Sequence, residues 1–589
     1  MKPFWSRTTH STPSSSQKQR PLDRLFHYVH NLHTSDRALF IIVGSALFIS
    51  LLWSGIVIND MVSEDIPSHE GMVTEGIVGT PRFINPVLAV TRADRDLGAL
   101  VYAGLARLDE TGVIVPDVAE TITVSDDGLV YNIIIRSDVR FHDNTELTAQ
   151  DVAFTIQRIQ DPGLASPLRA SWDGVAVEVI GTHEINFVLP SAYAPFIENL
   201  TVGILPHHIW KEASNEEFPF SQYNSEPIGA GPYKVTAVKR DPAGIPQSYI
   251  LTPYKHFYRT LPKIQTFTLN FYVNETKLID AFNAGAIDTI AGLSPETIEK
   301  LDGIENTHNT LTTPLPRTFA VFFNQNKSAA LRDPAVRQAL DHVVDREELI
   351  DTVLSGYAQP LYSPVPHGFD ADAIQDIEID AATRMDEARA ILRGGGWSIN
   401  EDTGIWEKEI DEIRTELAFS ISTANAPVFT ATAEYLQATW GLLGAGVSIK
   451  QFEQSDLTQA IIRPRNYEAL LFGTDLGRAL DFYSFWHSSQ RNDPGLNVAL
   501  YANITTDAIL ESARTLRDEE ERIDNYTRFE EEVKKEYPAV FLYQPLLTYI
   551  LPRQVTGVTL EGVSEPFERF TQIHNWYMDI ESVWPILNN

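Results

Sequence analysis

A segment of 20 residues without a charged side chain, residues 39–58 (LFIIVGSALFISLLWSGIVI), divides this 589-residue chain into two unequal parts. A helix rises 1.5 Å per residue, so such a segment would cover about 30 Å, the thickness of the hydrocarbon core of a bilayer. The segment therefore predicts one transmembrane helix near the N-terminus. Residues 59–589 must then form the folded part of the protein.

The charges on the two sides of this segment differ in sign. Basic residues precede it (Lys2, Arg7, Lys18, Arg20, Arg24, Arg37) and acidic residues follow it (Asp60, Glu64, Asp65, Glu70). The positive-inside rule then places residues 1–38 in the cytoplasm and the rest outside the cell membrane, in the periplasm or the extracellular space. The alternative is a cleaved signal peptide, but the apolar run is longer than is usual there, and no A-x-A-like cleavage site follows it.

The remaining chain divides by composition. Residues 1–38 are polar and rich in Ser, Thr and Gln, which predicts a disordered tail, and residues 59–72 are interpreted as a short acidic linker. From Met72 onward, predicted strands and helices alternate irregularly without a repeat, which favours a mixed α/β fold over a solenoid. The predicted helices include Glu519–Glu536, and the predicted strands include Val540–Tyr543. A chain of this length is too long for one compact core, so two or three lobes are expected.

Composition excludes several classes of function. The formal net charge is -33, and nucleic acid is bound mainly through clustered Lys and Arg, so no nucleic-acid partner is expected. The absence of cysteine excludes disulfides, cysteine zinc sites, iron–sulfur clusters and a thiol nucleophile. We found no P-loop, HExxH, G-x-S-x-G or Rossmann pattern, so the sequence predicts no cofactor, no metal site and no catalytic residue.

Residues 125–162 have an unusually clear local pattern of turn, strand, turn and helix. The run from Leu129 to Arg136 is rich in β-branched and aromatic residues, which predicts a strand. A turn at 142–145 follows, and Thr148 stands three residues before Asp151, the spacing of a helix-capping box. No residue in this segment is an obvious catalyst, but the pattern is distinctive.

Further segments follow in a fixed order along the chain: TP at 80–81, INP at 84–86, VYAGL at 101–105, PDVAE at 116–120, PIGAGPY at 227–233, NAGAID at 283–288, LRDPAVRQAL at 331–340, GGW at 395–397 and YPA at 537–539. Together with residues 125–162, this order resembles the family 5 extracellular solute-binding proteins, which bind peptides, oligopeptides or nickel for ABC importers. The resemblance covers about residues 73–580.

The resemblance implies a two-lobed, periplasmic-binding-protein-like α/β fold of the large cluster, with an extra subdomain. The first lobe would comprise residues 73–317, with the inserted subdomain at about 106–225, and residues 544–589 would return to it. The second lobe would comprise residues 318–543. The lobes would close like a hinge on a peptide ligand. Expected partners are an ABC permease and ATPase, with the chain itself a monomer. The alternatives are a nickel chelate or another small solute as ligand, or a surface sensor without a transport role.

The resemblance also points to an aspartate for the ammonium group of a peptide, because a buried ammonium needs an opposite charge. Asp475 is the first candidate and Asp481 the second, and either could instead cap a turn in a loop. The family often has D-P-D after this point, whereas this chain has Arg478-Ala479-Leu480-Asp481. The loss of that proline and one carboxylate changes the expected local geometry.

Other candidates for ligand contact lie in the predicted second lobe. Arg463 and Arg465 could bind a peptide carboxylate through their guanidinium groups, or they could be solvated loop charges. His367 lies in a loop that could reach the cleft. Aromatic side chains could pack against a ligand or belong to the core, and these are Trp397, Phe482, Tyr483, Phe485 and Trp486.

Overall fold

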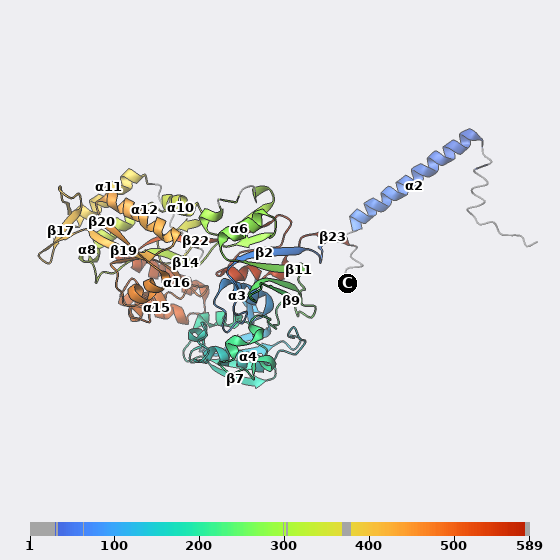
Figure 1. The fold of residues 1–589 in the computed structure, drawn as a ribbon, viewed down its shortest axis with the longest axis horizontal. Helices are drawn as coiled ribbons and strands as arrows, with labels where there is room; N and C mark the ends of the chain where they lie inside the picture. The colour runs from blue at the N-terminus through green and yellow to red at the C-terminus, as the bar shows by residue number, and fades with distance from the viewer. Residues whose placement is uncertain are drawn as a thin grey trace, which may run out of the picture. The chain divides into compact units, whose positions relative to one another are not determined.

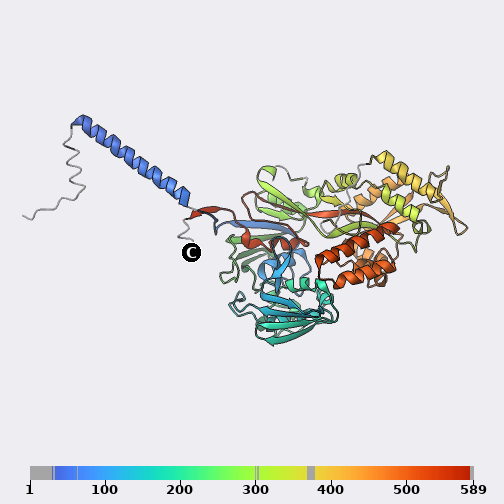
Figure 2. The ribbon, with the colours of Figure 1, turned by 180° about the vertical axis from the view of Figure 1, so that it is seen from behind.

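The computed structural model describes residues 30, 33–62, 64–298, 300–301, 304–367 and 379–583. The chain forms two compact units, which are described separately: Met1–Ser68 together with Ile580–Asn589, and His69–Asp579. Figures 1 and 2 show the ribbon from opposite sides.

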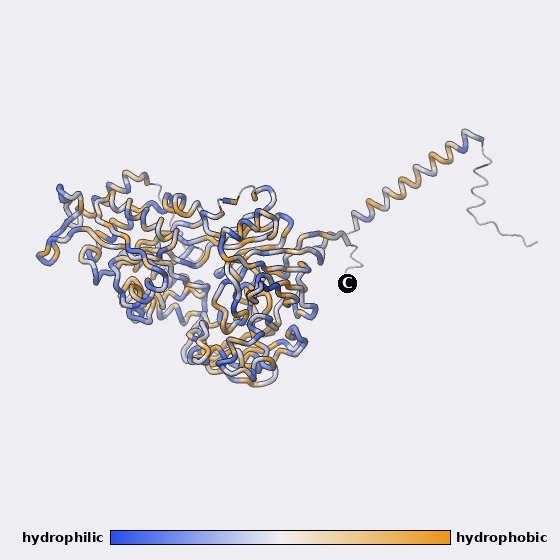
Figure 3. Tube along the Cα trace, in the orientation of Figure 1, coloured by the Kyte–Doolittle hydropathy of each residue, from blue (hydrophilic) through white to orange (hydrophobic). Residues whose placement is uncertain are grey.

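The first unit contains the predicted apolar helix. Helix α2 (Thr34–Val62) includes a candidate membrane span, Thr34–Val57, with a mean hydropathy of 2.3 and no burial against protein. Its apolar residues are visible along the tube in Figure 3. The helix begins before residue 39, so residues 34–38 are helical rather than part of a disordered tail, and most of that predicted tail lies outside the described residues.

The predicted linker and the predicted C-terminal return differ from the structure at their ends. Strand β1 (Glu64–Pro67) lies within residues 59–72 and pairs antiparallel with β23 (Ile580–Val583). Residues 580–583 therefore belong to the first unit instead of returning to the first predicted lobe. This assignment depends on backbone pairing between segments far apart in sequence, and no local sequence signal predicts such pairing.

The second unit is built on one long mixed sheet with the strand order β20-β19-β21-β14-β22-β12-β2-β11-β10-β9, and β13 and β15 also pair with β22. The bounds are β2 (Met72–Val78), β9 (Tyr233–Arg240), β10 (Pro246–Pro253), β11 (Thr266–Tyr272), β12 (Thr289–Ala291), β13 (His308–Pro314), β14 (Arg317–Phe323), β15 (Ala358–Pro360), β19 (Ala418–Ala424), β20 (Gly446–Phe452), β21 (Ala469–Asp475) and β22 (Ala539–Pro552).

Strand β22 lies within this sheet, between β14 and β12, and pairs with strands on both sides. Its residues 539–545 pair with β14 and β15, and its residues 546–552 pair with β13 and β12. The sequence predicted only a short strand here, Val540–Tyr543, and the strand is 14 residues long. We call residues 69–316 and 546–579 half I, and residues 317–545 half II. The change of partners along β22 lies close to the predicted lobe boundary.

Half I contains the segment at 125–162 that the sequence singled out. Strand β6 (Val130–Ile135) lies in a four-stranded sheet with β5 (Ala119–Val124), β8 (Glu184–Val188) and β7 (Ala176–Gly181). Helix α4 (Ala149–Gln160) begins with the predicted capping box of Thr148 and Asp151. The Nε2 atom of His142 lies 3.0 Å from the carbonyl oxygen of Gly231, which ties this segment to the PIGAGPY segment.

Half I contains further short strands and helices. They are α3 (Arg92–Val101), β3 (Ala106–Leu108), β4 (Ile114–Pro116), η1 (Arg169–Trp172), η2 (Ala194–Thr201), α5 (His207–Trp210), η3 (Phe218–Phe220), η4 (Gln222–Asn224), α6 (Glu275–Asn283), α7 (Pro295–Ile298), η5 (Ile304–Asn306), η8 (Pro566–Phe570) and η9 (Ile573–Asn575). Residues 547–576 contribute to the same apolar core as residues 73–269, so the C-terminal part of the chain completes half I.

Half II has a core on each face of its sheet. Helices α9 (Pro334–His342), α10 (Arg346–Leu354), α11 (Ala381–Gly394) and α12 (Pro427–Leu443) contribute to one core, and α14 (Tyr483–Trp486), α15 (Ile504–Thr515) and α16 (Glu519–Glu536) to the other. The remaining elements are α8 (Ala329–Arg332), β16 (Ser398–Ile399), β17 (Trp406–Ile410), β18 (Ile413–Glu416), α13 (Gln454–Asp456), η6 (Leu457–Ile462) and η7 (Ser488–Gln490). Helix α15 contacts η2 of half I.

The core of half I encloses a balanced set of charges. The guanidinium of Arg569 donates to both oxygens of Asp96, at 2.9 and 2.7 Å, and also to Glu75. The Nε atom of Arg92 lies 3.6 Å from Asp96, and the hydroxyl of Tyr549 donates to Glu75 at 2.9 Å. The cluster contains as many guanidiniums as carboxylates, and Arg569, Glu75 and Asp96 have almost no exposed surface.

Candidate ligand-binding site

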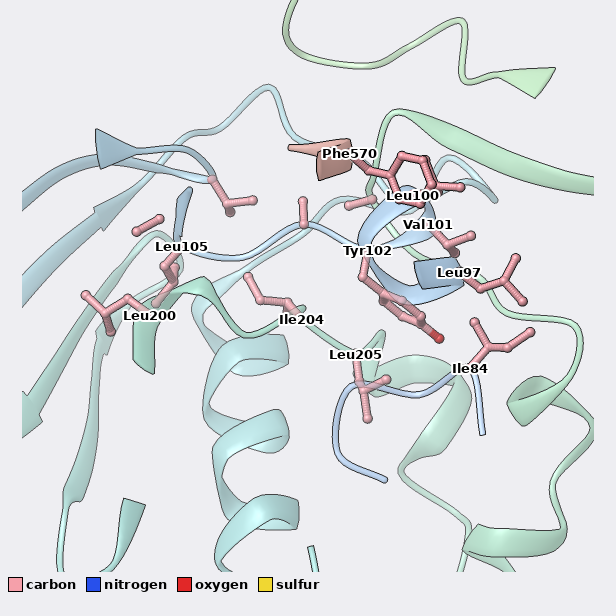
Figure 4. Packing of buried hydrophobic residues seen from close by; sticks show 14 of the residues in the cluster. Ile84, Leu97, Leu100, Val101, Tyr102, Leu105, Leu200, Ile204, Leu205 and Phe570 are labelled. Atoms are coloured by element: carbon pink, nitrogen blue, oxygen red, sulfur yellow. The ribbon is translucent and has the colours of Figure 1, made fainter. Parts of the chain in front are cut away.

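A cavity of about 440 Å³ lies in half I. Its wall includes the end of α3, residues 102–108, the segments 167–172 and 198–203, and residues 565–574 from the C-terminal part. Figure 4 shows one of these residues, Tyr102, among Ile84, Leu97 and Leu205. A cavity of this size, mainly apolar with a few polar groups, is typical of a site for a small ligand.

Two guanidinium groups on the cavity wall share one carboxylate. The Nε atom of Arg107 and the Nη1 atom of Arg259 lie 3.7 and 3.4 Å from the same oxygen, Oδ1 of Asp117. The Nη2 atom of Arg259 also lies 2.9 Å from Nε2 of His574. Because a guanidinium only donates hydrogen bonds, that ring nitrogen of His574 must accept, and the imidazole is neutral in this contact.

Burial and the two arginines explain the titration of these groups. Burial, and then the nearby charges of Arg259 and Arg107, lower the pKa of His574 to about 3. Burial also raises the pKa of Asp117, although both arginines oppose this shift. Burial and the repulsion by Arg259 lower the pKa of Arg107. With His574 neutral, this part of the wall carries an excess of positive charge.

Three further carboxylates line the cavity. Glu565 is 3.6 Å from Arg95 and 3.2 Å from Arg317, and Glu568 accepts a hydrogen bond from Arg478 at 2.7 Å. The third is Glu198 on η2, whose pKa is raised to about 7 because burial removes the carboxylate from water. The cavity wall therefore carries both acidic and basic groups, and Arg95 is itself one of the lining residues.

Two arginine side chains of half II contact the part of the cavity wall that carries Glu565 and Glu568, which we call the rim. Arg478 donates to the carbonyl oxygen of Gly112 at 3.0 Å as well as to Glu568, and Arg317 donates to Glu565. A Cβ atom on Gly112 would lie 2.5 Å from Cα of Gly562, so this close approach of two backbones requires glycine. These contacts place Arg478 and Arg317 of half II at the rim.

Both predicted amine ligands lie at this boundary between the halves, and each already has a cationic partner. Asp475 is exposed at the end of β21 and accepts from Nε of Arg317 at 2.8 Å. Asp481 accepts from two nitrogens of Arg514, at 3.1 and 2.8 Å. The guanidinium of Arg514 also lies over the ring of Tyr483, 4.2 Å from its centroid. An amine-binding role for either aspartate stays a prediction.

The two predicted arginines differ in their surroundings. Arg465 donates to three backbone carbonyls, those of Arg491, Ile462 and Gly495, at 3.0, 2.8 and 2.7 Å. These contacts hold a loop of half II together. Arg463 is exposed and lies 3.1 Å from Gln459 and 3.8 Å from Asp493. Neither arginine lines the cavity in half I.

Most of the predicted aromatic contacts belong to the cores of half II. Trp397, Phe482 and Trp486 are buried, as expected for core packing. Tyr483 stacks on His487 with ring centroids 4.1 Å apart, and Phe485 packs against the second core. The Nε2 atom of His367 lies 2.6 Å from the carbonyl oxygen of Pro360. The structure therefore gives each of these residues a packing or hydrogen-bonding role, and their ligand contacts stay predictions.

Reasoning from the sequence did not find the charged groups of the cavity. Arg107 and Asp117 stand beside or within segments that carried the family resemblance, VYAGL and PDVAE, but nothing marked their side chains as functional. Arg259 and His574 come from a loop and from the C-terminal part, 315 residues apart in sequence. No local signal could have brought these four residues together.

Comparison with known proteins places the chain in a family. The profile of the bacterial extracellular solute-binding proteins, family 5, matches residues 113–494, more than half of the chain. The oligopeptide-binding protein AppA of Bacillus subtilis is 25% identical over 87% of this chain and 92% of its own length. The nickel-binding periplasmic protein of Escherichia coli is 27% identical over 61% of this chain and 67% of its own length.

Solved structures show the same fold. The structure of AppA from Bacillus subtilis in complex with a nonapeptide has a TM-score of 0.65 at 24% identity, covering 87% of this chain and 100% of that one. NikZ from Campylobacter jejuni in complex with Ni(L-His) has a TM-score of 0.66 at the same identity and coverage. The predicted periplasmic-binding-protein-like α/β fold is confirmed. The chain belongs to the bacterial extracellular solute-binding proteins, family 5.

Proposed function

We propose that this chain is the substrate-binding protein of an ABC importer, that it binds peptides, and that it delivers them to a permease powered by an ATPase. Family membership supports a binding role without catalysis. The observation that carries the peptide proposal is the cavity of about 440 Å³ with both basic and acidic groups on its wall. A short peptide carries a carboxylate and an ammonium, so it complements both.

The proposal includes the arrangement of the chain in the cell. Helix α2 would anchor the protein in the membrane, with the N-terminal tail in the cytoplasm and the second unit outside, as the flanking charges indicate. Residues 73–317 with the return of the C-terminal part would be one lobe, and 318–543 the other. The change of pairing partners along β22 supports a hinge at this strand. A monomer is the proposed state.

Named relatives support a peptide ligand and also supply a competing one. The dipeptide-binding protein of Pseudomonas aeruginosa is 23% identical over 80% of this chain. The nickel-binding relative makes a nickel chelate the second candidate. Among the residues that the structure describes, no three His, Asp or Glu side chains converge as metal ligands, so a chelate would have to bring its own ligands.

Thermal unfolding of the full chain in detergent tests the ligand class. We expect a mixture of di- to pentapeptides to raise Tm, because a ligand bound only by the native state stabilises it by mass action. A nickel–histidine complex and maltose serve as competing solutes. A rise with either of them and none with peptides would contradict the peptide proposal, and hydrolysis of the peptides would contradict a role without catalysis.

Asp475→Asn tests the amine prediction in the same assay. We expect the affinity for peptides with a free N-terminus to fall about tenfold, since a charge-assisted contact is worth about 1.5–3 kcal/mol. Affinity for N-acetylated peptides should not change. Equal effects on both forms would mean that Asp475 only pairs with Arg317.

Mass spectrometry of the protein from isolated membranes tests the anchor. An intact mass that includes residues 39–58 is expected for a retained helix. A mature N-terminus after residue 58 would instead identify α2 as a cleaved signal peptide.

A further inference from the structure

We propose that Arg107 and Arg259 form a clamp for a carboxylate group in the cavity of half I, and that the clamp selects short ligands with a free acid terminus. This inference rests on the proposed function, because it concerns the same cavity. It assigns a defined part of the ligand to residues on the opposite half of the molecule from the predicted amine ligands.

The charge count on this part of the wall is the first argument. Arg107 and Arg259 share one ion-pair partner among the described residues, Asp117. Arg259 also donates to His574, whose imidazole is neutral in this contact. A buried charge is costly unless it is paired. One anion from a ligand would balance the excess positive charge.

The hydrogen-bond count is the second argument. Both arginines approach the same oxygen of Asp117, at 3.7 and 3.4 Å, which is longer than a good charge-assisted hydrogen bond. The Nε atom of Arg107 is buried and has no hydrogen-bond partner among the described residues, while its Nη1 atom donates to the carbonyl oxygen of Leu108 at 2.9 Å. A planar guanidinium suits a carboxylate, which can accept two parallel hydrogen bonds, and the buried Nε of Arg107 would take part only after a turn of the side chain toward the cavity.

Cavity size and the remaining charges suggest that the ligand is short. Both ends of a ligand must fit within about 440 Å³, because Arg107, Arg259 and Glu198 all line the same cavity. With its acid terminus at the arginines, a short peptide could direct its ammonium toward the part of the wall that carries Glu198, or toward the rim near Asp475. A longer peptide would have to leave the cavity.

The test compares ligands that differ only in the acid terminus. Titration calorimetry with the full chain in detergent would use di- and trialanine, each as the free acid and as the C-terminal amide, with succinate as an anion that is not a peptide. We expect the free acids to bind roughly ten- to a hundred-fold more tightly than the amides, which corresponds to the usual strength of hydrogen bonds to charged groups.

Variants assign the preference to the clamp. Arg107→Gln and Arg259→Gln should each remove most of the difference between acid and amide. Arg240→Gln is the matched control, because Arg240 lies in the same half, pairs with Glu226 at 3.4 Å and does not line the cavity. If Arg259→Gln does not fold, Arg107→Gln still decides the question, since it leaves the pair of Arg259 with Asp117 in place.

The outcomes separate the clamp from the proposed function. Tight binding of acid and amide alike would overturn the clamp and leave peptide binding intact. Binding of succinate that depends on Arg107, without any peptide binding, would support the clamp and overturn the peptide proposal. No heat from any of these compounds would overturn both.

Discussion

Half I contains two arginine clusters that differ in their balance of charge. In the core, Arg569 and Arg92 face the two carboxylates of Glu75 and Asp96, and Arg569 is fully buried. At the cavity, Arg107 and Arg259 share a single ion-pair partner within the described part of the chain, Asp117. The first cluster is balanced in charge without any ligand, although two buried nitrogens of Arg92 lack a hydrogen-bond partner among the described residues. The second cluster has one guanidinium more than carboxylates, and its arginines line a cavity.

The difference shows how to separate structural from functional charges in such a fold. Desolvation makes a buried charge expensive, so a structural arginine needs its full set of partners within the protein. An arginine that lacks such a full set of partners and lines a cavity large enough for a ligand is a candidate for ligand binding. The predicted site residue Arg465, whose donors meet three backbone carbonyls, resembles the first kind.

Removing the centre of the balanced cluster should have the largest effect. Arg569→Gln would leave Glu75 without its guanidinium partner and Asp96 with Arg92 alone, at 3.6 Å. We expect the free energy of unfolding to fall by about 3–5 kcal/mol, because an uncompensated buried charge is strongly destabilising. Urea denaturation of the full chain measures it, with Arg240→Gln as control. A loss below about 1 kcal/mol, the scale of a surface ion pair, would contradict the comparison.

The cavity cluster should make the stability of the protein depend on pH in the acidic range. The pKa of His574 in the folded protein is about 3, below its ordinary value of 6.5, so the unfolded state binds more protons between these values. Stability from this group is therefore complete above about pH 6.5 and is lost as the pH falls toward 3.

A His574→Gln variant isolates this contribution. Glutamine can still accept from Arg259 but does not titrate, so the stability of the wild type should fall more steeply in acid, by about 1.4 kcal/mol per pH unit. Urea denaturation between about pH 6.5 and pH 4 compares the two proteins. Parallel curves would mean that His574 is not held neutral beside Arg259.

Arg465 and Arg463 are a matched pair of neighbouring arginines in half II. Their substitution should have the smallest predicted effects on stability. Arg465→Ala leaves three backbone carbonyls without their donor, so we expect a loss of stability of about 1–3 kcal/mol. Arg463→Ala should change stability by less than about 0.5 kcal/mol, because Arg463 is exposed. Neither change should alter peptide affinity. Weaker peptide binding by either variant would support the predicted role of that arginine as a ligand contact.

Local structure was largely predictable from the sequence. The strand and capped helix within residues 125–162 formed as expected, and the predicted helix Glu519–Glu536 has those bounds in the structure. Side-chain periodicity and capping act within a few residues, so they are visible in the chain itself. The predicted strand at 540–543 was too short, because its continuation to Pro552 depends on partners in both halves.

The candidate site was much less predictable. The residues proposed from the resemblance lie in half II, and many of them are occupied by packing or by partners of their own. This applies to Trp397 and Trp486 in the cores and to Asp481 with Arg514. The cavity lies in half I and draws Arg107 and His574 from distant parts of the chain.

By itself, the sequence determined the apolar helix, the absence of cysteine chemistry, the family and most of the local elements, because composition, periodicity and motif order are properties of the chain. Only the tertiary structure decided which charges are balanced and which are not. Arg569 and Arg259 look alike in sequence. Among the described residues, folding brings two carboxylates to Arg569, whereas Arg259 shares its one ion-pair partner, Asp117, with Arg107.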